Sequence, residues 1–345
     1  SGTPAKLETW KNKYQVLGTS CYHYGNFDDI KNNPNIDAVY ICTPNAQHKD
    51  QTLRLAAAGK HVICEKPMAI NVKEAKEMIS ACEKAGVKLL IGYRMHFEAK
   101  TQEIVKMRMA GDFGKLVFFQ GLCGFKIGDP NQWRLNKDLA GGGAMMDLGC
   151  YPLHWVRTVM GSEPVVQSAG CIRSATAEGG AQIDVTMHAR LQFDNGVFAD
   201  IGCSMAEHLS RTPDTSLVLE GTQGQIEVSG LITPHLANNI KLTTADTERQ
   251  YSVPGHSTYY YQLLHLQDCL QGKAMPLTGG KDAINNMQLL DQIYQRAGLL
   301  SRGLCRQQRG GHRHDPLHGA PDDNDLALAG DGGLGDRADA RHIGG

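Results

Sequence analysis

Residues 60–67, Lys-His-Val-Ile-Cys-Glu-Lys-Pro, decide how the amino-terminal part of this chain folds. The first five form a short apolar run, which predicts a buried strand over 60–64. Asn71 and Glu74 have the spacing of a capping box, so a helix is expected just after them. Lys66 would then follow the carboxyl end of a strand, where open α/β sheets bind ligands, in a turn that Pro67 rigidifies. By residue type alone a solvated surface lysine is the commoner case, so the surrounding sequence has to decide.

The same alternation extends on both sides of this stretch. Apolar runs at 38–42, 61–64 and 88–92 are separated by helical patterns near 47–58 and 73–85. This βαβαβ order predicts a parallel sheet. Continuous apolar runs are typical of strands that are covered on both faces.

Polar side chains follow each of the three expected strands. Because the carboxyl ends of parallel strands meet at one edge, a ligand site is expected there. The groups are Pro44, Asn45 and His48 after the first strand, Glu65, Lys66 and Pro67 after the second, and Tyr93, Arg94 and His96 after the third.

Beyond a helix near 100–110 the periodicity changes to two. Apolar residues from Ile183 to Phe193 alternate with polar residues from Asp184 to Asp194, and a turn at 194–196 leads to a return strand at 197–203. Shorter strands are expected near 115–121, 217–220, 225–228 and 240–243, with helices near 259–271 and 281–297. The pattern predicts a second domain built on a large antiparallel sheet.

Composition excludes several classes of protein. A chain of 345 residues with 41 % hydrophobic content is long enough for about two domains with sizeable cores. A net charge of −1 gives no basic field for nucleic acid, and no apolar run is long enough to span a membrane. The ten cysteines contain no Cys-x-x-Cys pair, so free thiols are expected rather than disulfides or a metal site.

A second informative stretch covers residues 141–152, Gly-Gly-Gly-Ala-Met-Met-Asp-Leu-Gly-Cys-Tyr-Pro. The glycines would let backbone approach a ligand closely, and Pro152 fits only a first helical turn, so a helix is expected to begin near Gly149. Asp147 would lie at or near its N-cap, four residues before Tyr151, and both could face one ligand. Alternatively, Asp147 only caps the helix and Tyr151 packs in the core. Upstream, Trp133 and Arg134 combine an aromatic platform with a guanidinium, which suits a phosphate or a sugar.

From Ser1 to about Ala297 these motifs resemble the Gfo/Idh/MocA family of pyridine-nucleotide sugar oxidoreductases, and most of all its glucose-fructose oxidoreductase branch. The strings that carry the resemblance are IDAVYICTPNAQH (36–48), AAAGKHVICEKPMA (56–69), LLIGYRMHF (89–97), QWRLNKDLAGGGAMMDLGCY (132–151) and YQLLHL (261–266). Most family members have a histidine at the position of Tyr151. A tyrosine at this position is similar to the pattern of that branch and of dihydrodiol and xylose dehydrogenases.

The resemblance implies a catalytic group of Lys66, Asp147 and Tyr151, with Lys66 in contact with both nicotinamide and substrate. Trp133 and Arg134 match cofactor-binding positions. Ser1, Lys6 and Tyr24 match positions that hold the 2′-phosphate of NADP. A serine in place of an acidic residue also avoids repelling that phosphate, so NADP is expected over NAD, with NAD possible as well. No metal site is expected.

The expected fold is α/β plus α+β. A Rossmann-type doubly wound parallel sheet over 1–94 precedes an α+β domain with a large, mostly antiparallel open sheet over 95–297, and a disordered low-complexity tail occupies 298–345. The family pattern begins with a strand and a G-x-G-x-x-G turn that this sequence does not contain. We therefore expect a fragment that binds NADP weakly and aggregates, with an unpaired edge on the strand at 38–42.

The expected activity is NADP-dependent hydride transfer between nicotinamide and a sugar or related alcohol. Tyr151 is the candidate acid/base, and the Lys66 ammonium is expected to favour its ionised form. The alternatives are a trans-dihydrodiol or D-xylose dehydrogenase, or a nucleotide-sensing regulator without turnover. We expect a cytoplasmic homo-oligomer that associates through its second sheet, although the start of the sequence leaves an export signal open.

Overall fold

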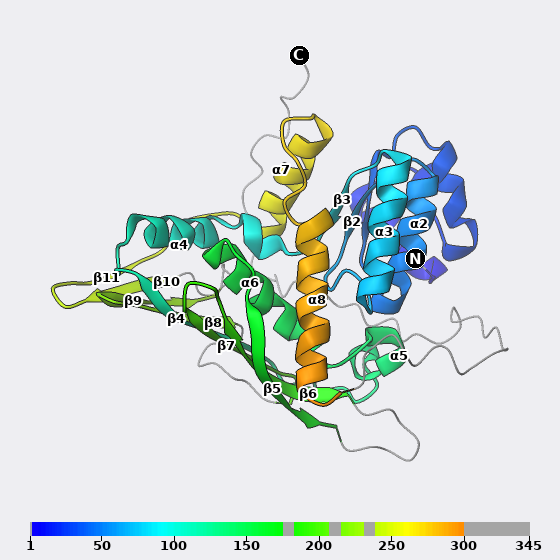
Figure 1. The fold of residues 1–345 in the computed structure, drawn as a ribbon. Helices are drawn as coiled ribbons and strands as arrows, with labels where there is room; N and C mark the ends of the chain where they lie inside the picture. The colour runs from blue at the N-terminus through cyan, green and yellow to red at the C-terminus, as the bar shows by residue number, and fades with distance from the viewer. Residues whose placement is uncertain (1, 175–182, 207–214, 231–238, 300–345) are drawn as a thin grey trace.

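The computed structural model describes residues 2–174, 183–206, 215–230 and 239–299, which form two sheets with helices packed on them (Figure 1). The first sheet consists of β1 (Ala38–Ile41), β2 (His61–Cys64) and β3 (Leu89–Ile91), paired in parallel in the order β1-β2-β3. The predicted parallel sheet is confirmed. Within the described residues β1 is an edge strand, as expected.

Helices α2 (His48–Ala57) and α3 (Val72–Ala85) cover one face of this sheet (Figure 1). Asn71 accepts a hydrogen bond from the Glu74 amide at 2.9 Å, which confirms that α3 begins after an asparagine cap. Against the sheet, Leu266 of α7 (Thr258–Leu270) packs on Ile63 and Leu90. The strands are therefore enclosed by helices, which explains their continuous apolar sequences.

Between residues 4 and 32 the structure has three elements that the sequence did not predict. They are the helix α1 (Pro4–Tyr14) and the 3-10 segments η1 (Gly18–Ser20) and η2 (Tyr24–Asn32). The apolar residues Leu7, Trp10 and Tyr14 have helical spacing in α1, but no residue of this helix is buried, so its pattern is weaker than that of the helices that pack on the sheets.

The second sheet has eight strands in the order β11-β10-β9-β8-β4-β7-β6-β5. Its pairs are antiparallel except β4 with β7, which confirms the expected large, mostly antiparallel sheet. The strands are β4 (Leu116–Gly124), β5 (Val165–Arg173), β6 (Asp184–Gln192), β7 (Phe198–Ser204), β8 (Thr215–Gly221), β9 (Gly224–Ser229), β10 (Asn239–Thr244) and β11 (Glu248–Tyr251).

The two strands that the sequence did not predict, β5 and β11, lie at the edges of this sheet. In β5 only Val166 is buried, and none of the four residues of β11 is. Edge strands need few apolar residues because much of their side-chain surface stays in water, so period-two alternation is weak in them.

Helices α4 (Ala99–Ala110) and α6 (Cys150–Met160) pack on the second sheet, where the Trp155 ring meets Phe119 edge-on at 6.3 Å. The long helix α8 (Gly280–Arg296) runs beside both α3 and β5, so it joins the two halves of the molecule (Figure 1). We propose the domain boundary at 94/95, in the segment η4 (Arg94–Phe97) between the sheets. The tail expected to be disordered lies outside the described residues from 300 onward.

The nine cysteines in the described part of the chain are free thiols, as expected, and Cys305 lies outside it. Among the described residues, none of the helices combines the length and hydropathy needed to cross a bilayer.

A buried polar cluster joins α6 and α8 to η4. The Tyr93 ring stacks on His154 with centroids 4.2 Å apart, and His154 Nε2 lies 3.1 Å from Asp282. Asp282 also pairs with Arg157 at 2.9 Å. Burial, with His154 nearby, lowers the pKa of His96 in this cluster to about 4.

The low pKa of His96 makes the fold sensitive to acid. The unfolded chain, with a histidine pKa near 6.5, binds the proton more readily, so stability present above that pKa is lost as pH falls toward 4. We expect His96 to cost at most about 2 kcal/mol of unfolding free energy between pH 7 and about pH 5. Urea unfolding of the wild type and His96→Gln at both pH values measures this, and an equal loss in both proteins would contradict it.

Candidate active site

Lys66 lies two residues beyond the end of β2, and its side chain is only 11 % exposed. The Nζ atom donates to the backbone oxygen of Asp147 at 2.6 Å and to Asp147 Oδ1 at 3.0 Å. Burial alone would lower the pKa of Lys66, but Asp147 and then Tyr151 raise it well above its usual range. The residue is therefore a buried, charged group that bridges the two halves, and the solvated-surface alternative is wrong.

Asp147 lies in a single turn of π-helix, η6 (Met145–Gly149), which continues directly into α6. The predicted helix start near Gly149 is confirmed, since α6 begins at Cys150, but the prediction that Asp147 lies at its N-cap is wrong, because Asp147 lies inside the preceding π-helical segment. A π-turn shifts the normal hydrogen-bond ladder and is common at functional sites. Here the Asp147 carbonyl oxygen accepts from Lys66.

The Asp147 carboxylate is held between two cations. Its Oδ1 faces Lys66, and its Oδ2 lies 3.2 Å from Arg134 Nε. Burial would raise the pKa of Asp147, but Lys66 and Arg134 together outweigh it, so the pKa is lowered and the group is ionised at neutral pH.

Tyr151, in the first turn of α6, is 6 % exposed, and Lys66 Nζ lies 4.5 Å from the centre of its ring. Burial raises the pKa of Tyr151 to about 12 despite the opposing effects of Lys66 and Arg94. The expectation that the Lys66 ammonium favours the ionised form is confirmed, but loss of solvation outweighs its effect on the pKa. At neutral pH the phenol keeps its proton and can donate it.

The glycines at 141–143 have protein atoms as close neighbours, which corrects the expectation that they admit a ligand. A Cβ on Gly142 would lie 2.4 Å from the Tyr294 hydroxyl, and one on Gly143 would lie 1.9 Å from the Asp184 backbone oxygen. Asp184 is 1 % exposed, although the alternation in β6 assigned it to the polar face. The glycine loop buries this first residue of the strand.

Glu65 and Arg94 lie at the neighbouring strand ends. Glu65 accepts from the Tyr40 hydroxyl at 2.7 Å and from the Lys66 amide at 3.1 Å. Arg94 is buried, donates to the Thr258 hydroxyl, and stacks over the Tyr259 ring at 4.5 Å. The first turn of α7 therefore contributes side chains to this edge of the first sheet. No motif in the sequence of α7 predicted this.

Pro44, Asn45 and His48 form the loop and first turn after β1, with Asn45 in η3 (Asn45–Gln47). Asn45 donates to the Ala140 backbone oxygen at 2.8 Å. His48 is fully buried, with Nδ1 3.0 Å from the Pro67 oxygen and Nε2 2.8 Å from the Thr43 oxygen. Burial lowers the pKa of His48, and since a neutral ring has a single N–H, it donates to only one of these two backbone oxygens while packing between the loops after β1 and β2.

Trp133 and Arg134 lie in the short segment η5 (Trp133–Leu135), before α5 (Lys137–Ala140). The Arg134 guanidinium stacks on the Trp133 ring at 4.7 Å. Trp133 Nε1 is buried and has no hydrogen-bond partner among the residues that the structure describes.

The three residues expected at a 2′-phosphate belong to the amino-terminal segment. Ser1 lies outside the described residues. Gly2 packs against the Tyr24 ring, since a Cβ there would lie 3.2 Å from two ring carbons. Lys6 lies in the first turn of α1, where its amide donates to Thr3.

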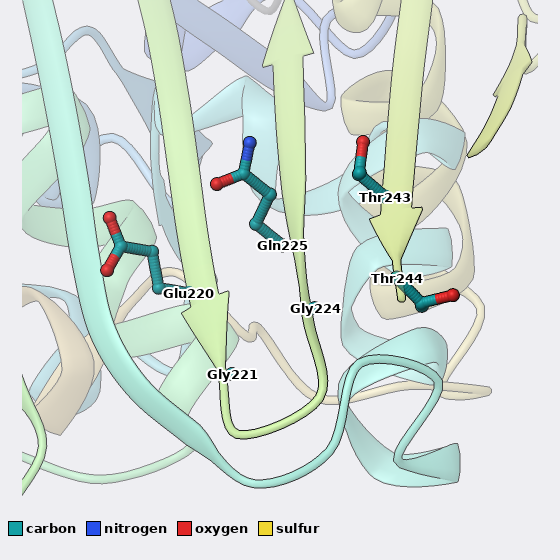
Figure 2. A pocket seen from close by; sticks show the side chains of 6 residues that line it. All are labelled: Glu220, Gly221, Gly224, Gln225, Thr243 and Thr244. Carbon is teal, nitrogen blue, oxygen red and sulfur yellow. The ribbon is translucent and has the colours of Figure 1, made fainter. Parts of the chain in front are cut away.

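The second sheet has a separate hollow of about 350 Å³ at the tips of β8, β9 and β10 (Figure 2). No predicted site residue contributes to it. Its lining is formed by Glu220, Gly221, Gly224, Gln225, Thr243 and Thr244.

Comparison with known families matches most of the described chain. Residues 3–93 match the GFO_IDH_MocA oxidoreductase family with its NAD-binding Rossmann fold, and residues 101–227 match the GFO/IDH/MocA C-terminal domain.

Three relatives cover most of the chain. The NADP(+) D-xylose 1-dehydrogenase of Haloarcula marismortui is 28 % identical over 79 % of this chain and 75 % of its own length. The trans-1,2-dihydrobenzene-1,2-diol dehydrogenase of Mus musculus is 28 % identical over 72 % of this chain and 73 % of its own. The crystal structure of aldose-aldose oxidoreductase from Caulobacter crescentus with glycerol is 34 % identical and superposes with a TM-score of 0.79 over 86 % of this chain and 88 % of that one.

Proposed function

We propose, since this chain belongs to the Gfo/Idh/MocA oxidoreductase family, that it transfers a hydride between NADP and a sugar or a related alcohol. It is an oxidoreductase of the sugar and polyol dehydrogenase type with an NAD(P)-binding Rossmann domain. One observation carries the finer proposal. The Lys66 ammonium, at a strand end of the first sheet, meets both Asp147 and the Tyr151 ring from the second half of the chain.

The residues at this edge fit a nicotinamide nucleotide. The buried indole N–H of Trp133, which has no acceptor among the described residues, suits a ligand that offers one. We propose that Trp133, Arg134, Glu65, Lys66, Pro67, Arg94, Pro44 and Asn45 hold or frame the cofactor. His48 would act indirectly by fixing the two loops that its ring nitrogens face.

When bound, the nicotinamide supplies the acceptor or donor of the hydride. Transfer from an alcohol carbon requires loss of the hydroxyl proton, and the reverse reaction requires its return. We propose that the Tyr151 hydroxyl exchanges this proton, and that Lys66 orients the substrate hydroxyl beside it. Asp147 would hold Lys66 in position, and Arg134 would keep the Asp147 carboxylate ionised.

The preference for NADP is proposed to depend on Ser1, Lys6 and Tyr24. A 2′-phosphate would gain a charge-assisted interaction from Lys6, so Lys6→Ala should weaken NADP binding by roughly tenfold and leave NAD binding unchanged. Lys11→Ala is the matched control, because Lys11 lies on the same helix and pairs with Glu8 at 3.2 Å. Fluorescence titration with both cofactors measures the effect, and equal losses for NAD and NADP would contradict it.

A panel of aldoses, ketoses and diols with NADP tests the activity itself, followed by absorbance of the reduced nicotinamide. D-xylose and trans-dihydrodiols belong in it, because dehydrogenases of these compounds are among the relatives. The 34 % identity to an aldose-aldose oxidoreductase favours aldoses. NADP binding without hydride transfer to any member would favour a nucleotide-sensing regulator.

We also propose a homo-oligomer that associates through the open face of the second sheet. Val165 and Phe198 are 53 % and 40 % exposed there and flank Gln192, on the face opposite the buried Ala199 and Ile201. Large apolar side chains on an open sheet are typical of a surface that gains a partner. Light scattering of the purified protein tests this.

A further inference from the structure

Asp184 and Tyr294 form a buried polar cradle under the glycine loop. Asp184 Oδ1 accepts from the Gly143 amide at 2.8 Å and from the Tyr294 hydroxyl at 2.7 Å, and Oδ2 accepts from the Met145 amide at 2.7 Å. The Gly143 amide is also 3.2 Å from the Tyr294 oxygen. A carboxylate that is 1 % exposed is thereby satisfied on both oxygens.

This cradle is connected to Asp147 through one residue. The Asp147 amide donates to the Gly143 backbone oxygen at 3.1 Å, and the Gly143 amide is held by Asp184. Side chains of β6 and α8 therefore fix the backbone from which the Asp147 carboxylate projects toward Lys66.

The position of the cradle controls the register of the helical segment. A carboxylate that accepts the first amides of a helix stabilises that particular start. If the start moved by one residue, each side chain in the segment would rotate by about 100° around the axis. Asp147 would then no longer point at Lys66.

The glycines of the loop are complementary to the cradle. Gly142 approaches the Tyr294 hydroxyl and Gly143 approaches the Asp184 backbone more closely than any Cβ would allow. The loop and the cradle thus form one unit, built from residues about 40 and 150 positions apart.

We propose that Asp184 and Tyr294 are a positioning pair, which sets the helix start so that Asp147 holds Lys66 beside Tyr151. In this proposal the pair acts through the backbone amides of Gly143 and Met145, and not on the reacting groups themselves. The inference rests on the proposed function for its effect on turnover, but its effect on Lys66 can be measured without any substrate.

The first test compares Asp184→Asn and Tyr294→Phe with the wild type. Asparagine at position 184 keeps one acceptor oxygen but turns an NH₂ group toward a backbone N–H of the glycine loop. Phenylalanine at position 294 removes only the hydroxyl. We expect kcat to fall by roughly tenfold to a hundredfold for Asp184→Asn and less for Tyr294→Phe, with KM within about threefold, because misplacement of a reacting group mainly affects the chemical step.

Asp282→Asn is the matched control. It removes a partly buried carboxylate that pairs with His154 and Arg157, and it lies on α8 as Tyr294 does. If Asp184→Asn loses no more kcat than Asp282→Asn at equal loss of stability, the role of Asp184 is only structural and the proposal is overturned.

The second readout is the acetylation rate of the Lys66 amine by acetic anhydride, followed by mass spectrometry of its peptide. Pairing with Asp147 favours the protonated amine, which does not react with the anhydride, so we expect labelling to rise several-fold in Asp184→Asn and Tyr294→Phe and to stay unchanged in Asp282→Asn. Unchanged labelling in folded Tyr294→Phe refutes the proposal even if Asp184→Asn fails to fold. Raised labelling in a protein whose Tyr151→Phe variant remains active would instead support the positioning pair and refute the proposed function.

Discussion

Tyr151→Phe is expected to lower kcat for hydride transfer by at least about a hundredfold and to leave the dissociation constant of NADP within about twofold. Phenylalanine keeps the ring that packs beside Lys66 and removes only the hydroxyl that would exchange the proton. Steady-state kinetics with the best substrate of the panel and a cofactor titration measure the two quantities separately.

The pH dependence adds a second criterion for Tyr151. With a pKa raised to about 12, the phenol is protonated at neutral pH. Carbonyl reduction, which uses the proton, should therefore be insensitive to this group near neutrality, whereas alcohol oxidation should accelerate as pH rises. Retention of wild-type turnover by Tyr151→Phe would refute the assignment.

Lys66→Met is expected to damage both turnover and stability. The variant removes the group proposed to orient substrate, so kcat should fall by at least about a hundredfold. It also leaves the buried Asp147 carboxylate with Arg134 alone. Removing one partner of a buried pair typically costs about 3–5 kcal/mol, and we expect the lower end because Arg134 remains. Urea unfolding and kinetics on the same preparation measure both effects.

The double variant Lys66→Met/Asp147→Asn separates these two losses. Neutralising the orphaned carboxylate should restore part of the unfolding free energy without restoring kcat. If the double variant is no more stable than Lys66→Met, the pairing of Lys66 with Asp147 does not explain the loss.

The sequence predicted most of the framework because the framework follows local rules. Apolar runs gave β1, β2 and β3, the Asn71 cap gave the start of α3, and period-two alternation gave β6 and β7. It did not predict α1 or the edge strands β5 and β11, which bury almost no apolar surface and so give only a weak pattern.

The candidate site was predicted only in part, for a physical reason. The position of Lys66 at the end of a strand follows from the apolar run that precedes it. The register of the turn that carries Asp147 depends instead on Asp184 and Tyr294, which are distant in sequence. Alternation along β6 assigned Asp184 to solvent, because a one-dimensional pattern does not reveal that a glycine loop covers the end of the strand. The raised pKa of Tyr151 was not predicted for a similar reason, since burial is a property of the packed molecule.

The ion pair between Lys66 and Asp147 determines which property this protein loses first when it unfolds. One partner comes from each half of the molecule, and α8 packs against both. A chain whose halves had come apart could keep its helices and strands and still lose its chemistry. Catalytic activity therefore depends on contact between the two halves of the molecule, and we expect it to be lost before the secondary structure is lost.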